Sequence, residues 1–195
     1  MKLHIAKDAT DLSMQAAVWI ASIIKQTLEK QDRFTIALSG GSTPQKLHNL
    51  LSGYPYKEEI DWSRLHIFWG DERAVPFEDE RNNAKMAFDT LLDNVGVPMA
   101  QIHLMRTDIS PEESAAEYET ILQKYFDKSG PSFDLVLLGM GDDGHTLSLF
   151  PGQPVVHEAS AWVHSFFLAA QNMYRITLTA PIVNRSAHVA FLTAG

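Results

Sequence analysis

The sequence predicts an α/β domain built on a mostly parallel sheet with flanking helices. Two observations lead to this class. Short apolar runs recur along the chain, and segments with apolar residues at helical spacing lie between the first of these runs. Buried strands that alternate with amphipathic helices are typical of parallel sheets, because each crossover helix covers one face. With 195 residues, 45% of them hydrophobic, the chain is long enough for one domain with a substantial core.

Each expected element rests on a local signal. Pro44 suits the first turn of a helix, because the N–H that proline lacks has no partner there. Ser110 is the expected N-cap of a helix that begins with Pro111. The helical spacing of apolar residues predicts helices over residues 12–29, 43–51, 82–92 and 111–126. The apolar runs predict strands over residues 34–38, 65–69, 133–138, 161–168, 174–179 and 187–193.

Composition excludes several classes of function. The net charge of −8 argues against a nucleic-acid partner, and no apolar stretch is long enough to span a membrane. Residues 1–8 lack the apolar run of a signal peptide. The chain has no cysteine, which excludes disulfides, thiolate metal sites and a cysteine nucleophile, and a reducing cytoplasm is the expected location. A phosphorylated small molecule fits this composition, because a pocket needs only a few local donors.

The first candidate loop is SGGSTP, residues 39–44, between a strand and a helix. Ligands of parallel sheets bind at the carboxyl ends of the strands, where this loop lies. Gly40 and Gly41 let the backbone approach a ligand closely, and Ser42 and Thr43 add hydroxyl donors to the free N–H groups of the helix start. The alternative is a capped glycine turn. The G-K-[ST] ending of a Walker A loop is absent.

The second candidate loop is GDERAVP, residues 70–76, after the strand that ends at residue 69. Adjacent acids and an arginine at a strand end bring a carboxylate and a bidentate phosphate donor together. The alternative is a solvated charged turn.

The third candidate loop is GMGDDGHTLSLFPG, residues 139–152. Its glycines fit the dinucleotide pattern G-x-G-x-x-G, but Pro151 leaves no room for the helix of about three turns that this pattern requires. The acids beside His145 lack the spacing of known metal sites. What remains is a glycine-rich turn that presents His145, either as a proton acceptor or as a structural histidine.

These three loops, in this order, resemble the 6-phosphogluconolactonase family. The resemblance extends to RITLT at 175–179 and to VAFLTAG at 189–195. It implies a Rossmann-like fold of the sugar-phosphate isomerase/deaminase type. It also implies hydrolysis of 6-phospho-D-glucono-1,5-lactone to 6-phospho-D-gluconate in the oxidative pentose phosphate pathway, without a metal or cofactor.

The sequence departs from the family pattern at several positions. Leu147 stands where the family usually has alanine, and Asn82-Asn83 where it has serine-asparagine. The chain stops at Gly195, where members of the family continue into a helix that starts with a lysine, and then a strand. We therefore expect residues 1–195 to form one 6-phosphogluconolactonase-like domain without that C-terminal helix and strand.

The resemblance and the loop chemistry together predict the site. The phosphate is expected to bind Gly40, Gly41, Ser42 and Thr43, with Arg73 and Arg175 as charged donors. His145 is the expected general base, and Gly141 and Gly144 are expected to allow a tight turn whose N–H groups bind the oxyanion. Asp71 is expected to orient His145; the alternatives are that it binds sugar hydroxyls or caps a turn.

Two other functions remain open. A glucosamine-6-phosphate deaminase would carry an aromatic residue at the position of Arg73 and a G-H-I-A-F-N-like run in place of residues 144–150. A non-catalytic sugar-phosphate sensor commonly carries a DNA-binding module, and the sequence shows no such module. Both comparisons favour the lactonase.

Overall fold

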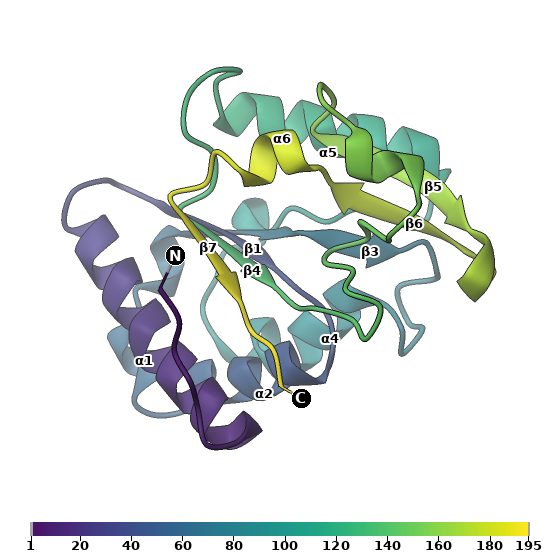
Figure 1. Ribbon diagram of the computed structural model, residues 1–195. Helices are drawn as coiled ribbons and strands as arrows, with labels where there is room; N and C mark the ends of the chain where they lie inside the picture. The colour runs from purple at the N-terminus through teal and green to yellow at the C-terminus, as the bar shows by residue number, and fades with distance from the viewer. Residues whose placement is uncertain (1, 195) are drawn as a thin grey trace.

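The computed structural model describes residues 2–194, so Gly195, the last residue of the family resemblance, lies outside it. Its centre is a four-stranded parallel sheet in the order β2-β1-β4-β7. The strands are β1 (Phe34–Leu38), β2 (Leu65–Trp69), β4 (Leu135–Leu138) and β7 (His188–Phe191). Helices cover both faces of this sheet (Figure 1).

The two faces of the parallel sheet bury separate apolar clusters. On one face, Ile36 and Leu137 pack with residues of α1 (Ala9–Leu28), α2 (Ser42–Leu51) and α4 (Asn83–Thr90). On the other face, Ala37 and Val136 pack with α5 (Pro111–Tyr125) and α6 (Ala180–Val183). Alternate residues of each strand serve opposite faces, which is why the central strands are apolar throughout. The short helix α3 and the 3-10 turns η1 to η5 lie in the connections, at Tyr56–Glu59, Trp62–Arg64, Leu92–Asn94, Met99–Gln101, Pro154–His157 and Ala169–Gln171.

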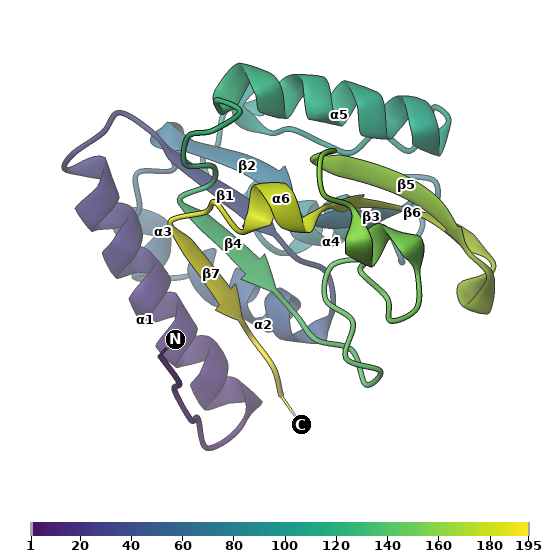
Figure 2. The same ribbon diagram turned by 45° about the horizontal axis from the view of Figure 1, so that its top comes forward.

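A second, antiparallel sheet extends from the end of β2. It contains three strands in the order β3-β6-β5, namely β3 (Asp71–Arg73), β6 (Met173–Leu178) and β5 (Val163–Leu168). Gly70 joins the two sheets: its N–H donates to Leu38 O at 2.8 Å, and its carbonyl accepts from Leu178 N at 2.8 Å. Figure 2 shows this smaller sheet beside the parallel one, beneath α5.

The structure confirms the expected fold class and most of the expected elements. Ser110 caps α5 with a complete capping box, in which Glu113 bonds back to the cap residue. The prediction was wrong for residues 71–73, which we expected in a loop. They form β3, because β6 supplies backbone partners in the register Asp71↔Thr177 to Arg73↔Arg175.

Two further features concern the surface. No helix within residues 2–194 is long and apolar enough to cross a membrane. Strand β7 lies at the edge of the parallel sheet, and Phe191 on it is 56% exposed. The expectation of a further C-terminal helix and strand stays a prediction.

Candidate active site

The three candidate loops meet in one cleft at the carboxyl ends of the parallel strands. The cleft has a volume of about 260 Å³ and is also bordered by the segment that follows β7. Its lining includes Gly40, Gly41, Ser42, Thr43, Asp71, Arg73, Asn83, Gly141, His145 and Arg175. A larger hollow of about 420 Å³ lies between α5 and β5, away from all three loops. We assign the smaller cleft as the candidate site, because parallel sheets bind ligands at this edge.

The first loop offers an uncapped helix start to an anion. Gly41 is the N-cap of α2, with φ at 105°, and no side chain caps this helix. Gly41 and Ser42 are exposed and line the cleft, so the first turn of α2, whose N–H groups have no partner within the helix, borders the cleft. Gly40 is tightly packed: a Cβ there would lie 1.8 Å from Asn83 Oδ1. The backbone thus reaches the cleft where only glycine fits.

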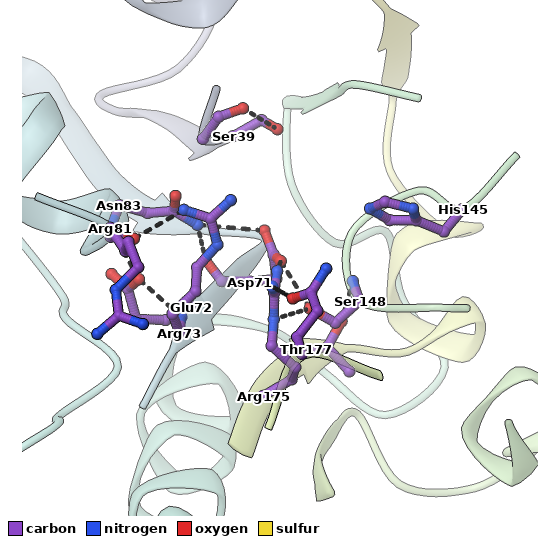
Figure 3. A network of polar contacts seen from close by, with 12 residues as sticks. Ser39, Asp71, Glu72, Arg73, Arg81, Asn83, His145, Ser148, Arg175 and Thr177 are labelled. Atoms are coloured by element: carbon purple, nitrogen blue, oxygen red, sulfur yellow. Dashed lines mark hydrogen bonds and ion pairs between the residues drawn. The ribbon is translucent and has the colours of Figure 1, made fainter. Parts of the chain in front are cut away.

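Arg73 lines the same cleft as this loop and brings a positive charge to it. Its Nη1 donates to Arg81 O at 2.7 Å, while its Nε is buried and has no hydrogen-bond partner among residues 2–194. Figure 3 shows Arg73 on β3 beside Glu72 and Asn83. Arg73 lines the cleft, and a guanidinium there is a type of donor that suits a phosphate.

Asp71 lies in a buried network with Arg175 and Ser148. Its Oδ2 accepts from Arg175 Nη2 at 2.7 Å and from Ser148 Oγ at 2.7 Å, and Arg175 Nε donates to Ser148 Oγ at 2.9 Å (Figure 3). Asp71 is 4% exposed and Arg175 is 3% exposed. Burial by itself would raise the pKa of Asp71, but the charges of Arg175 and Arg73, together with the hydrogen bonds from Ser148 and Arg175, outweigh burial and hold the pKa below its ordinary value.

Two expectations concern this network. The expected contact between Asp71 and His145 is not formed, because both partners are bound elsewhere: Asp71 by Arg175 and Ser148, His145 by Asp143. Arg175 is paired with Asp71 and buried, so its role as a phosphate donor stays a prediction that would compete with this pair.

His145 is held at the mouth of the cleft by its own loop. Its Nδ1 lies 2.5 Å from Asp143 Oδ1, and this bond lowers the pKa of the Asp143 carboxyl. Its ring stacks on Phe150, with centroids 4.0 Å apart and planes at 22°. The ring also occupies the space above Gly141, where a Cβ would lie 2.3 Å from Cε1 and Nδ1. Gly144 has φ at 82°, which fits the tight turn expected from the sequence.

Gly141 and Gly144 form the tight turn that was expected of them, and the binding of an oxyanion by N–H groups of this loop stays a prediction. The N–H of Gly141 donates to His145 O at 2.8 Å, and the N–H of Gly144 donates to Gly141 O at 2.8 Å. Both groups therefore stabilise the turn itself, and neither points free into the cleft.

Glu72 supports the site from beneath. Its carboxylate accepts from the backbone N–H groups of Asn83 at 2.7 Å and Ala84 at 2.8 Å, at the start of α4. Burial raises the pKa of Glu72 to about 7, against the lowering effect of these bonds. Asn83 in turn donates to Asp71 O at 2.9 Å. Glu72 thus fixes α4 against β3.

Five contributors to the site were not assigned from the sequence. They are Glu72, Asn83, Asp143, Ser148 and Phe150. Asp143 carried a detectable signal, since a carboxylate two residues before a histidine in a tight turn can reach its Nδ1. Within residues 2–194, no group of three or more His, Cys, Asp or Glu side chains is placed to hold a metal ion.

Comparison with known proteins gives consistent matches. A family model described as "Glucosamine-6-phosphate isomerases/6-phosphogluconolactonase" matches residues 7–195. "Probable 6-phosphogluconolactonase 3, chloroplastic" of Oryza sativa subsp. indica is 40% identical over 195 residues, covering 94% of this chain and 59% of that protein. The 6-phosphogluconolactonase of a Nostoc strain is 38% identical over 200 residues, covering 99% of this chain and 80% of that protein.

A solved structure agrees with these sequence matches. The 6-phosphogluconolactonase of Trypanosoma brucei superposes with a TM-score of 0.87 at 28% identity, covering 98% of this chain and 81% of that chain. The present chain thus spans less than two thirds of the rice protein, but about four fifths of the Nostoc and trypanosome proteins.

Proposed function

The chain belongs to the glucosamine-6-phosphate isomerase/6-phosphogluconolactonase family, and from this premise we propose that it hydrolyses 6-phospho-D-glucono-1,5-lactone to 6-phospho-D-gluconate. One observation carries the proposal. The cleft combines an uncapped helix start for a phosphate with a histidine whose Nδ1 is engaged by Asp143, which leaves Nε2 for water. The names of the rice, Nostoc and trypanosome relatives support the same substrate.

The phosphate of the substrate binds at the start of α2. The N–H groups after Gly41 and the hydroxyls of Ser42 and Thr43 surround it, and Arg73 supplies the positive charge. This end of the substrate is remote from the reacting carbonyl, so its binding energy serves to orient the lactone.

His145 acts as the general base. With a proton on Nδ1 donated to Asp143, its Nε2 accepts a proton from water while the water oxygen attacks C1 of the lactone. The Asp143 carboxylate stabilises the imidazolium that forms. When the tetrahedral intermediate collapses, the bond from C1 to the ring oxygen breaks and His145 returns the proton to that oxygen. The products are a carboxylic acid and a free hydroxyl, which balances the water consumed.

Asp71 positions His145 through the loop rather than by direct contact. Ser148 belongs to the same loop as His145, and its hydroxyl donates to Asp71 on β3. The buried ion pair with Arg175 keeps the Asp71 carboxylate in place, and Asp71 in turn holds Ser148 and its loop against β3.

One experiment separates this function from its alternatives. The purified protein is incubated with fresh lactone and, separately, with glucosamine 6-phosphate. We expect acid release from the lactone above the uncatalysed background and no ammonia from the amino sugar. Ammonia release would assign a deaminase, and binding without turnover would assign a sugar-phosphate sensor. The cytoplasmic location and the absence of a nucleic-acid partner stay predictions.

A further inference from the structure

The Phe150 ring contacts His145 but takes no part in the chemistry proposed above. Phe150 is 6% exposed, although it lies in the loop that borders the cleft. Its ring stacks on the imidazole of His145 with centroids 4.0 Å apart and planes at 22°. The guanidinium carbon of Arg175 lies 5.7 Å from the centroid of the same ring. Phe150 therefore connects the imidazole to the buried pair of Arg175 and Asp71.

The hydrogen bond to Asp143 does not by itself orient the imidazole. A single bond at Nδ1 fixes one edge of the ring and leaves the ring free to tilt about that contact. The Asp143 side chain is 53% exposed, so it has few neighbours that hold it in turn. A general base needs its Nε2 directed at the attacking water, and this direction depends on the plane of the ring.

A flat neighbour at stacking distance supplies the missing restraint. With Phe150 4.0 Å from the imidazole, a tilt of the histidine would drive one ring edge into the aromatic face. Phe150 cannot retreat easily, because it is buried and lies against Arg175, which is bonded to both Asp71 and Ser148. We propose that Phe150 is a positioning residue that fixes the plane of the His145 imidazole. The proposal rests on the general-base function of His145.

Kinetic constants of two variants test the role of the ring. Phe150→Leu keeps an apolar side chain but removes the flat face, and Phe150→Tyr keeps the face. We expect Phe150→Leu to lower kcat about 10- to 100-fold, because a misplacement of about 1 Å has an effect of that size. KM should stay within about twofold, because the phosphate contacts are unchanged. Phe150→Tyr should retain most of the wild-type kcat.

A matched control separates positioning from stability. Phe133 is fully buried in the cluster beneath α5, where it packs against Phe68 and Phe126. Phe133→Leu removes an equally buried ring at the opposite end of β4 from the cleft. We expect it to lower the melting temperature and to leave kcat unchanged. Equal losses of kcat in both variants would reduce Phe150 to a stabilising residue and overturn the proposal.

A spectroscopic measurement tests the stacking without any substrate. Protons above an aromatic ring are shielded, so the Hε1 signal of His145 should lie upfield of an exposed histidine. His145→Gln identifies this signal among those of the eight histidines. At one fixed pH, the signal should move downfield in Phe150→Leu and stay in Phe150→Tyr. An unmoved signal in Phe150→Leu, or wild-type kcat in that variant, overturns the proposal. A wild-type protein that hydrolyses no lactone overturns the proposed function instead.

Discussion

The substitution Gly141→Ala should displace the His145 imidazole without touching the substrate. A Cβ at this position would lie 2.3 Å from Cε1 and Nδ1 of His145, whereas ordinary contacts begin at 3.4 Å. The imidazole therefore has to move by about 1 Å, and a misplacement of this size near the chemistry lowers kcat by about 100-fold. The neighbouring Phe150 ring blocks part of the space for this movement.

The assay is the initial rate of lactone hydrolysis, corrected for the uncatalysed reaction, together with a thermal melt. Gly141 belongs to neither apolar cluster, so we expect the fold to persist and KM to change little. Gly96→Ala is the matched control, because no atom lies within 4 Å of its added Cβ, and it should keep wild-type kcat. A folded Gly141→Ala protein with wild-type kcat would refute the assigned position of His145.

Three further substitutions test the phosphate site, the buried ion pair and the pH dependence of stability. Arg73→Ala should raise KM by about 10- to 100-fold through loss of one charge-assisted bond, and an unchanged KM would remove Arg73 from the phosphate site. Asp71→Asn leaves Arg175 buried without its counter-charge, so chemical denaturation should show that the free energy of unfolding falls by up to about 3–5 kcal/mol. The kcat of this variant should also be lower. An unchanged free energy of unfolding would contradict the anchoring role of Asp71. Burial lowers the pKa of His48 in the folded protein to about 4. As the pH falls below about 6.5, this histidine therefore becomes protonated in the unfolded chain while it stays neutral in the folded protein. The contribution of neutral His48 to the free energy of unfolding is complete above about pH 6.5 and is lost as the pH falls toward 4. His48→Leu should therefore flatten the decline of unfolding free energy between these pH values by up to about 3 kcal/mol, and a wild-type slope in this variant would contradict the assignment.

The parallel sheet could be predicted from the sequence because its strands carry their own signal. The strand at residues 34–38 was predicted with its observed bounds, since every one of its side chains is buried between two helical layers. The start of α5 could also be predicted from local sequence, because Ser110 and Glu113 form reciprocal hydrogen bonds within one turn.

The antiparallel sheet and the buried network could not be predicted in the same way. Strand β3 has three residues, Asp71–Arg73, all charged, and only pairing with β6 makes it a strand. The partner of Asp71 is Arg175, which lies 104 residues later in the chain. No local pattern indicates that an acid and a base so far apart will share a buried site, so the sequence favoured a solvated turn and a direct contact with His145.

The loop of His145 could be predicted only in part. Its turn was predicted because Gly144 suits a positive φ. The contacts of the imidazole with Asp143 and Phe150 involve neighbours in sequence, but they depend on how the turn folds back on itself. Residue spacing therefore predicted that the turn presents His145, but it did not predict the groups that orient the imidazole.

If His145 activates water for lactone hydrolysis, its replacement by glutamine should remove that activity, which is tested by the kcat of His145→Gln measured beside its thermal melt. Removal of a general base typically lowers the rate by about 10²–10⁴-fold, so we expect a loss of that order with KM nearly unchanged and a melting temperature close to that of the wild type. The uncatalysed hydrolysis of the lactone is subtracted in every run, because it masks a weak enzyme. A folded His145→Gln protein that retains wild-type kcat would show that His145 is not the general base.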